Sequence, residues 1–395
     1  MHAPEPRPRV PLLVQLVLAL IAGGLVGAAL GPRVAVLGEL ALVFVKLLKL
    51  LATPLVFVAI IDTFATTRLP PRRALVLLPI STINALVAAA IAIGLAHALP
   101  LGRFVDLVRL RQLVLQPAPP PPHAIALLLR GIEYLLIENL LWVIGAALLT
   151  GLLVRALGQR PSGKRMARLA HDGFALLMRA LGVVVRLVPL AAFGVMAKVV
   201  GTSGLAIFPV LGVFVLLVTV GIALHVFAWY GLVLKLLART SPARFFRLGG
   251  DALGTALGAG SSLATLPVTL RTLEERMGVS QESARLAAVV GTNLNHDGIV
   301  LYEAAAALFV AQLYGIALTV AAQVKVVGLA ILAAVGIAGV PEAGLVTLAL
   351  VLGRAGLPLA AVPLVLPVDW MLGRLRATAN VASDMVVATL LDRWK

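Results

Sequence analysis

The sequence predicts an all-α protein that crosses a membrane many times. Of its 395 residues, 61% are hydrophobic and only 13% are charged, whereas soluble domains are roughly half apolar and one quarter charged. Apolar stretches recur from Val10 almost to the C-terminus, and about 20 apolar residues suffice for one transmembrane helix. We therefore expect nearly the whole chain to lie in the membrane, with no room for a separate soluble enzyme domain.

Basic residues cluster in alternate short loops. The formal net charge of +16 would suggest nucleic-acid binding in a soluble protein, but this distribution is the positive-inside pattern of membrane proteins. It explains the charge with no nucleic-acid partner, and it places both termini and these loops in the cytoplasm of a cell with a bacterial-type inner membrane. The clusters are Arg68, Arg72 and Arg73; Arg155, Arg160, Lys164, Arg165 and Arg168; and Lys235, Arg239, Arg244 and Arg247.

The first half of the chain predicts six ordinary crossings, which put the basic loops on one side as required. The first apolar stretch has no polar cleavage region after it, so we expect a retained helix, not a signal peptide. The proline run within residues 101–123 predicts an extended outer connector. Absence of cysteine excludes disulfides and thiolate metal sites. The six stretches are residues 10–30, 38–63, 73–99, 123–155, 170–200 and 203–238.

The second half differs, because small and polar residues interrupt its apolar segments. Residues 251–273 are rich in glycine, serine and threonine, and residues 325–352 place a glycine- and proline-rich tip between two apolar arms. Arms of about 12 residues are too short to span a bilayer, so each segment predicts a re-entrant helical hairpin. Irregular backbone at that depth is tolerated where it lines a cavity, and paired hairpins indicate a transporter binding site.

Two further segments carry ionisable residues inside apolar sequence. Residues 281–312 predict a helix broken near Asn295 to Gly298, and residues 359–391 predict a last helix with several charged side chains. A charge at the bilayer centre costs about 2.5 to 3.5 kcal/mol on insertion scales. We therefore expect these side chains to face one another, water or ions, and to form the functional site.

Arg376, Asn380 and Asp384 lie four residues apart, so they share one face of the last helix. A guanidinium matches a carboxylate bidentately, which makes Arg376 the expected anchor for an anionic substrate. The alternative is that Arg376 is only paired with Asp369 or Asp384.

Hard oxygen donors beside the broken helix predict a cation site. Asn295, Asp297 and Asp384, together with freed backbone carbonyls, suit a weakly held Na⁺; alternatively, Asn295 and Asp297 only cap the following half-helix. His296 is either a proton site or a hydrogen-bonding residue. His225 stands alone in an apolar span and is assigned to the role of a satisfied hydrogen-bonding residue.

Taken together, these features resemble those of the dicarboxylate/amino acid:cation symporter family, which includes the glutamate and aspartate transporters. The resemblance spans nearly the whole chain, and five motifs in the right order make it specific. These motifs are KLLKLLATPLVFVAIID at 46–62, SSLATLPVT at 261–269, NHDGIVLYE at 295–303, GIAGVPEAGLVT at 336–347 and VDWMLGRLRATANVASD at 368–384.

The resemblance implies a glutamate-transporter-like homotrimer, with eight spanning helices and two re-entrant hairpins arranged as inverted repeats. Residues 1–72 would form scaffold helices 1 and 2, and residues 101–202 the outer loop and scaffold helices 4 and 5. Residues 73–100, which form helix 3, and residues 203–395 would form a transport domain that moves like an elevator.

The resemblance also implies two sets of site residues. The substrate set consists of Ser261, Ser262, Val340, Gly344, Gly373, Arg376, Ala377 and Asn380. The Na⁺ set consists of Gly291, Asn293, Asn295, His296, Asp297, Ala334, Val335, Ile337, Asn380 and Asp384, with Ser81, Thr82 or Asn84 as candidates from the third helix.

Four positions depart from the family pattern. Gly373 stands where amino-acid transporters of the family have an aspartate that binds the substrate's amino group, and Ala377, Ile299 and His296 replace other residues near the site. A buried ammonium without a carboxylate partner is costly. A C4-dicarboxylate such as succinate or malate therefore competes with aspartate and glutamate as the expected substrate.

The sequence thus predicts a secondary symporter, and not an enzyme, that takes up a small acidic solute with Na⁺ and is surrounded by membrane lipid. Coupling to H⁺ in place of Na⁺ is the alternative that His296 suggests. A passive anion channel is the alternative from another functional class, because a basic, water-lined face could also conduct anions.

Overall fold

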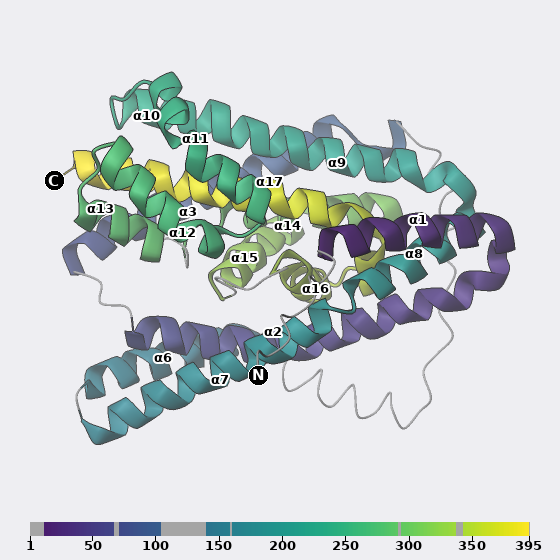
Figure 1. Cartoon of the computed structure of the whole chain (residues 1–395), viewed down its shortest axis with the longest axis horizontal. Coiled ribbons are helices and arrows are strands. Elements are labelled where there is room, and N and C mark those ends of the chain that lie inside the picture. The colour runs from purple at the N-terminus through teal and green to yellow at the C-terminus, as the bar shows by residue number, and fades with distance from the viewer. Residues whose placement is uncertain are drawn as a thin grey trace, which may run out of the picture.

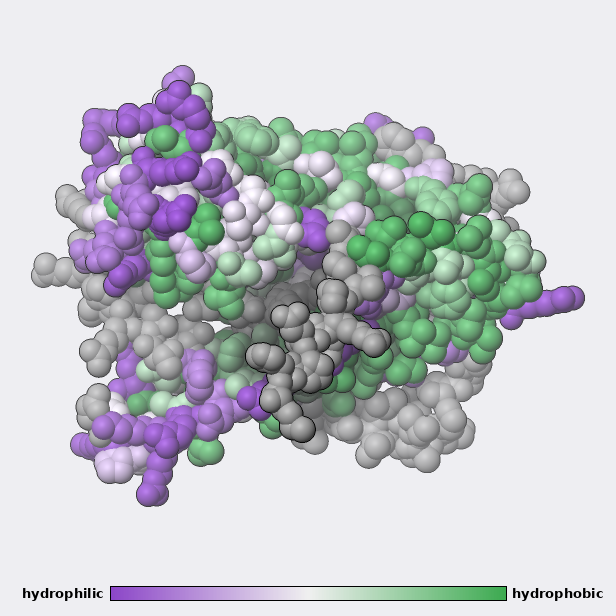
Figure 2. All heavy atoms as spheres, in the orientation of Figure 1, coloured by the Kyte–Doolittle hydropathy of each residue, from purple (hydrophilic) through white to green (hydrophobic). Residues whose placement is uncertain are grey.

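The computed structural model describes residues 12–66, 71–103, 140–158, 160–290, 294–336 and 343–394. Within these ranges the regular elements are all helices and no strand occurs, so the all-α prediction is confirmed. Among the same residues, five helical stretches are long and apolar enough to cross a membrane. Figure 2 shows apolar surface over the middle and right of the molecule, with hydrophilic residues gathered at the left end. This distribution suits a multi-pass membrane protein.

One group of helices comes from the first half of the chain. In it α1 packs along α8, and α2 packs against α6, α7 and α8. Figure 1 shows α2, α6 and α7 side by side along the lower edge of the molecule. The helices are α1 (Leu12–Leu30), α2 (Gly38–Thr66), α6 (Leu140–Leu157), α7 (Pro161–Val185) and α8 (Val188–Ser203), with a 3₁₀ turn at Gly31–Leu37.

Glycines bring α1 and α8 into close contact. A Cβ atom at Gly23 would lie 2.5 Å from the carbonyl oxygen of Phe193, and one at Gly27 would lie 2.5 Å from that of Ala197. Such small residues let membrane helices approach closely and gain van der Waals packing.

Replacing Gly27 with valine is expected to destabilise the protein by about 1 to 3 kcal/mol, because the added side chain would overlap backbone atoms of α8. The measurement is the midpoint of thermal unfolding of the purified protein in detergent. Gly94 is the matched control, because a Cβ there would meet nothing within 4 Å. An equal loss of stability in both variants would show that contact with α8 is not the cause.

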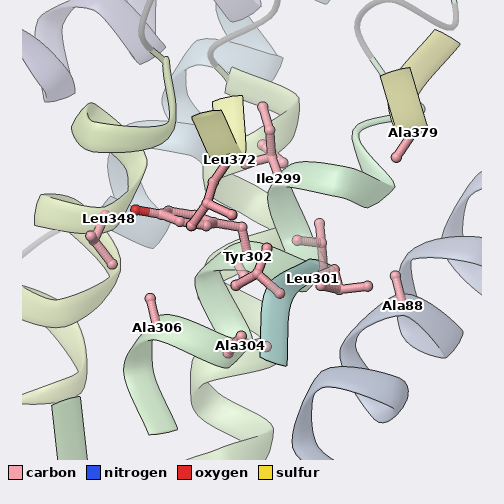
Figure 3. Packing of buried hydrophobic residues seen from close by; sticks show 14 of the residues in the cluster. Ala88, Ile299, Leu301, Tyr302, Ala304, Ala306, Leu348, Leu372 and Ala379 are labelled. Carbon is pink, nitrogen blue, oxygen red and sulfur yellow. The ribbon is translucent and has the colours of Figure 1, made fainter. Parts of the chain in front are cut away.

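A second group of helices surrounds α14 (Asp297–Tyr314), which is buried along almost its whole length. This helix packs against α3, α9, α15, α16 and α17. Figure 3 shows Leu301 facing Ala88 of α3, and Tyr302 reaching toward Leu348 of α16. The added elements are α3 (Pro71–Ala98), α9 (Ile207–Ala223), a π-helical segment (Leu224–Trp229), α10 (Tyr230–Leu236) and α17 (Val362–Arg393).

Both segments expected to form hairpins fold as pairs of packed helices. The first pair is α11 (Pro242–Ala259) and α12 (Ser262–Arg271), joined at Gly260, whose φ of 66° is the left-handed conformation that glycine favours. The second pair is α15 (Val320–Gly336) and α16 (Ala343–Ala355), which contact each other. Their re-entrant path through a membrane stays a prediction.

The break predicted within residues 281–312 is confirmed. A short helix α13 (Gln281–Arg285) continues into a π-helical segment (Leu286–Val290), and α14 begins only at Asp297. Asn295 and His296 between them are not helical.

The structure corrects several predicted boundaries. The stretch expected as one crossing at 170–200 is divided between α7 and α8 at Arg186 and Leu187, and Pro189 lies in the first turn of α8, where its missing N–H costs no helical hydrogen bond. The first arm of the second hairpin, α15, has 17 residues and is longer than expected.

All three basic clusters expected in loops extend into helices, the first because Arg72 and Arg73 lie at the start of α3. Helix α7 begins at Pro161 and α11 at Pro242, because proline suits the first turn of a helix. Three of the basic side chains therefore lie exposed on the first turns of α7, namely Lys164, Arg165 and Arg168. Figure 1 shows the end of α6, the start of α7 and the link from α10 to α11 at the same end of the molecule.

Candidate functional site

One face of α17 meets the broken end of α14. The Asn380 side-chain oxygen accepts the backbone N–H of Gly298 at 2.9 Å, and one Asp384 carboxylate oxygen accepts the amide N–H of Asn295 at 3.0 Å. Arg376, Asn380 and Asp384 are each at most 4% exposed. The predicted shared face is confirmed, and it is turned toward the break.

Glycine at position 298 permits this contact. A Cβ atom there would lie 2.5 Å from the backbone oxygen of Arg376 and 2.9 Å from its Cα, which are distances that real side chains do not adopt. The first turn of α14 therefore touches the α17 backbone directly, and the two helices are held together at the site.

Arg376 forms a bidentate ion pair within its own helix. Its Nη1 lies 2.8 Å from Oδ1 of Asp369, and its Nη2 lies 3.3 Å from Oδ2. The guanidinium also lies over the Tyr302 ring, with its central carbon 4.0 Å from the ring centroid. The structure thus shows the Asp369 pairing that the sequence left as an alternative, whereas Asp384 is bonded to Asn295.

Two glycines border the same guanidinium. A Cβ atom at Gly344, in the first turn of α16, would lie 2.2 Å from Nη1 of Arg376, and one at Gly373 would lie 3.2 Å from Nη2. Asp369 takes two of the five N–H donors that an arginine carries. The second hairpin therefore touches the buried cation through backbone, and the cation keeps donors for a further anion.

The first hairpin is attached to α17 by another arginine. Arg374 Nη1 donates to the carbonyl oxygen of Gly258 at 2.7 Å, close to the hairpin tip. Ser261 caps α12 by accepting the backbone N–H of Ala264 at 3.3 Å, and Ser262 is the first residue of α12. Sequence reasoning did not assign this role to Arg374, although it stands two residues from Arg376.

Asp297 is held by side chains from two other helices. Its Oδ2 accepts the hydroxyl of Tyr230 at 2.6 Å and that of Ser383 at 2.7 Å, and Nε2 of His225 lies 3.5 Å away. Its Oδ1 is buried and has no hydrogen-bond partner among the described residues. His225, which the sequence analysis expected to be a hydrogen-bonding residue, lies 3.0 Å from the Tyr230 hydroxyl and belongs to this cluster. Tyr230 and Ser383 were missed.

Of the three candidates on α3, Ser81 and Asn84 are buried and face other segments of the chain, whereas Thr82 does not. The Ser81 hydroxyl bonds to the side-chain oxygen of Asn295, and the side-chain oxygen of Asn84 accepts the indole N–H of Trp229 at 2.9 Å. Thr82 is exposed. Because Ser81 and Asn84 are three residues apart, they lie on one face of α3. That face meets Asn295 and Trp229, which are the sequence neighbours of His296 and Tyr230.

Capping does not explain the polar residues at the break. The N-cap of α14 is His296, which makes no capping bond through its side chain. Asn295 and Asp297 use their side chains for the contacts described above. His296 is 3% exposed, and its Nδ1 has no partner in the described part of the chain.

Of the remaining predicted site residues, some lie within the described ranges and others do not. Ala334 is buried and Val335 half-buried on α15, and Ala377 is buried on α17 beside Arg376. Four predicted residues lie outside the described ranges, namely Gly291, Asn293, Ile337 and Val340.

A buried acid that the sequence analysis did not single out also lies near Arg376. Glu303 on α14 is 0% exposed and bonds to the Thr347 hydroxyl of α16. An acidic residue directly following Tyr302 in an apolar helix was the sequence signal for it.

The chain is similar in sequence to known transporters. Over 237 residues the chain is 38% identical to mouse excitatory amino acid transporter 4, covering 58% of this chain and 42% of that protein. It is 36% identical over 256 residues to mouse excitatory amino acid transporter 3, covering 65% and 49%. For human excitatory amino acid transporter 2 it is 35% identical over 261 residues, covering 65% and 44%.

The chain thus spans about half the length of these relatives. The family model for the sodium:dicarboxylate symporter family matches residues 12–394. A family of symporters also confirms that the chain is not an enzyme. The chain belongs to the sodium:dicarboxylate symporter family.

Proposed function

We propose that this protein is a secondary active symporter that takes up a small acidic solute together with Na⁺. The observation that carries the proposal is that a buried cation, Arg376, and two buried acids, Asp297 and Asp384, lie on α17 and on the broken start of α14, two helices that contact each other through Gly298. Charges persist at such depth where they bind a substrate, an ion or each other. The family description, which names sodium and dicarboxylates, supports the same conclusion.

Arg376 binds the solute in this proposal. Its guanidinium is fixed by Asp369 and by the Tyr302 ring, and a fixed planar donor group favours a carboxylate ligand. Backbone of the second hairpin at Gly344 touches the guanidinium, so that hairpin would contact the bound solute. Ser261, Ser262 and Asn380 complete the proposed set.

Sodium ions bind at the two carboxylates. Asp384 with Asn295 and Asn380 is one candidate site, and the open Oδ1 of Asp297, together with Asn295 and the third-helix candidates Ser81 and Asn84, is another. These are neutral and anionic hard oxygens, which suit Na⁺. The backbone at Ala334 and Val335, with the undescribed positions of the same set, is proposed for a third ion on the basis of the family resemblance.

A C4-dicarboxylate is the favoured solute class. Gly373 supplies no carboxylate, Asp369 is already paired with Arg376, and Arg374 adds a second cation on the same helix. A substrate ammonium would lack the carboxylate that an aspartate at position 373 supplies in amino-acid transporters of the family, and unpaired buried charges are costly. A solute with two carboxylates and no amino group avoids that cost.

The architecture expected from the resemblance belongs to the same proposal. It comprises eight spanning helices, two re-entrant hairpins, inverted repeats and a homotrimer in the plasma membrane, with both termini cytoplasmic. Residues 1–72 and 101–202 form the scaffold and outer loop, and residues 73–100 and 203–395 form a domain that moves like an elevator. The packing of α1, α2, α6, α7 and α8 among themselves supports this division.

The test is uptake of labelled succinate and labelled aspartate into proteoliposomes. We expect accumulation above the equilibrium concentration when Na⁺ is high outside, and none when choline replaces Na⁺. Equilibration without accumulation would indicate a passive anion channel and overturn the proposal. Accumulation driven by a pH gradient in the absence of Na⁺ would replace Na⁺ with H⁺ as the coupling ion.

Replacing Gly373 with aspartate is expected to raise the preference for aspartate over succinate by about tenfold or more. The new carboxylate would pair with the ammonium group of aspartate, which succinate lacks, and leaving such a buried charge unpaired costs more than the about 1.4 kcal/mol that corresponds to a factor of ten. The ratio of kcat/KM values for the two solutes in proteoliposomes measures it. Gly373→Asn is the control of equal size without the charge. If both variants shift the ratio equally, the carboxylate is not the determinant.

A further inference from the structure

The helix that contains Tyr230 is interrupted by a π-helical segment. Helix α9 ends at Ala223, residues Leu224–Trp229 are π-helical, and α10 continues from Tyr230. A π-helical turn shifts the register of the side chains that follow it, and such turns are frequent at functional sites. In this protein the turn precedes a fully buried tyrosine hydroxyl.

The Tyr230 hydroxyl fixes the carboxylate of Asp297. It donates to Oδ2 at 2.6 Å, and its oxygen lies 3.0 Å from Nε2 of His225, so two neighbours hold it in place. The Ser383 hydroxyl donates to the same Oδ2 at 2.7 Å. One carboxylate oxygen is therefore fully engaged, while Oδ1 is buried without a partner among the described residues.

Trp229, the residue before Tyr230, also holds a polar side chain, in this case one from α3. The indole N–H of Trp229 donates to the side-chain oxygen of Asn84 at 2.9 Å, and the side-chain nitrogen of Asn84 has no partner within the described ranges. Two adjacent residues, one ending the π-helical segment and one beginning α10, thus hold polar side chains from α3 and α14.

We infer that Tyr230 is a positioning residue for cation binding at Asp297, with His225 and Ser383 as its supports. The inference rests on the proposed Na⁺ coupling. Side chains that orient a metal ligand lower metal affinity by about 10- to 100-fold when they are removed. With Oδ2 held by two hydroxyls, Oδ1 is presented in one direction, and no ordering of the carboxylate is needed when the ion arrives.

The test is Na⁺-dependent thermal stabilisation of the purified protein, which requires no transport. In Tyr230→Phe we expect the Na⁺ concentration for half-maximal stabilisation to rise about 10-fold or more, with choline chloride holding ionic strength constant. Tyr314→Phe is the matched control, because Tyr314 is the last residue of α14 and only half-buried. The KM for solute at saturating Na⁺ is expected to stay within about twofold, since the Arg376 contacts do not include Tyr230.

An unchanged Na⁺ half-saturation in Tyr230→Phe would overturn the inference and leave the proposed function standing. A wild-type protein that Na⁺ does not stabilise would overturn the Na⁺ coupling, and the inference with it. If Tyr230→Phe does not fold, Ser383→Ala serves as the second variant, because it removes the other hydroxyl from Oδ2. An unchanged response in Ser383→Ala would then overturn the inference.

Discussion

Uptake of the acidic solute is expected to fall at least about 100-fold when Arg376 is replaced with lysine. Lysine keeps the positive charge but lacks the planar fork, so it cannot hold both oxygens of Asp369 and a solute carboxylate together. A hydrogen bond to a charged group is worth about 1.5 to 3 kcal/mol, and each 1.4 kcal/mol is a factor of ten, so the loss of the second bond to each carboxylate accounts for this effect. Arg376 is 4% exposed, so water cannot compensate for the loss.

This prediction is checked by initial rates of Na⁺-driven uptake, together with the thermal shift caused by solute on the purified protein. Arg179→Lys on the exposed surface of α7 is the matched control and is expected to keep wild-type rates. If Arg376→Lys keeps both uptake and the solute-induced shift, the pair with Asp369 is purely structural and the solute binds elsewhere.

The second large effect is expected at Asp384. Asparagine has almost the same shape and can still accept the amide N–H of Asn295, which lies 3.0 Å from Oδ1, so the local packing is retained. The negative charge is lost, and a cation in a water-poor site depends on that charge. We expect Na⁺-driven uptake to fall about 100-fold or more, which corresponds to about 2.7 kcal/mol.

The decisive measurement for Asp384→Asn is Na⁺-dependent stabilisation compared with uptake. We expect the variant to show neither Na⁺-dependent stabilisation nor Na⁺-driven uptake. Its thermal midpoint in the absence of Na⁺ is expected to equal or exceed that of the wild type, because a buried charge without an ion partner has been removed. Asp172→Asn, on the exposed face of α7, is the control. A normal Na⁺ response in Asp384→Asn would exclude this carboxylate as an ion ligand.

Composition and hydropathy were sufficient to predict the helical class, the break before Asp297 and the two helix pairs, because each depends on local sequence. Helix ends were less well predicted. Proline at position 161 starts α7 several residues earlier than the apolar stretch indicates, and the turn at Arg186 lies within apolar sequence. Hydropathy does not distinguish a turn buried among apolar residues from a continuous helix.

The site was predictable where its residues lie at helical spacing, as Arg376, Asn380 and Asp384 do. Contacts between distant segments were not. Tyr230 and Asp297 are 67 residues apart, and nothing in a tyrosine near the end of an apolar span indicates its partner. His225 was expected to be hydrogen-bonded, but its partners Tyr230 and Asp297 were not predicted, since a single histidine has the same local sequence pattern whichever residue it bonds.

The contact between Gly298 and the backbone of Arg376 limits how the molecule can change shape. With no side chain between them, and with Asn380 accepting the Gly298 N–H at 2.9 Å, the start of α14 cannot slide along α17 without losing that bond and colliding with the main chain. The carboxylates and the guanidinium must then keep fixed mutual spacing through any transition. In the proposed transport cycle, solute and ions would therefore move together with α14 and α17. The contacts that change would be those between this pair of helices and their neighbours.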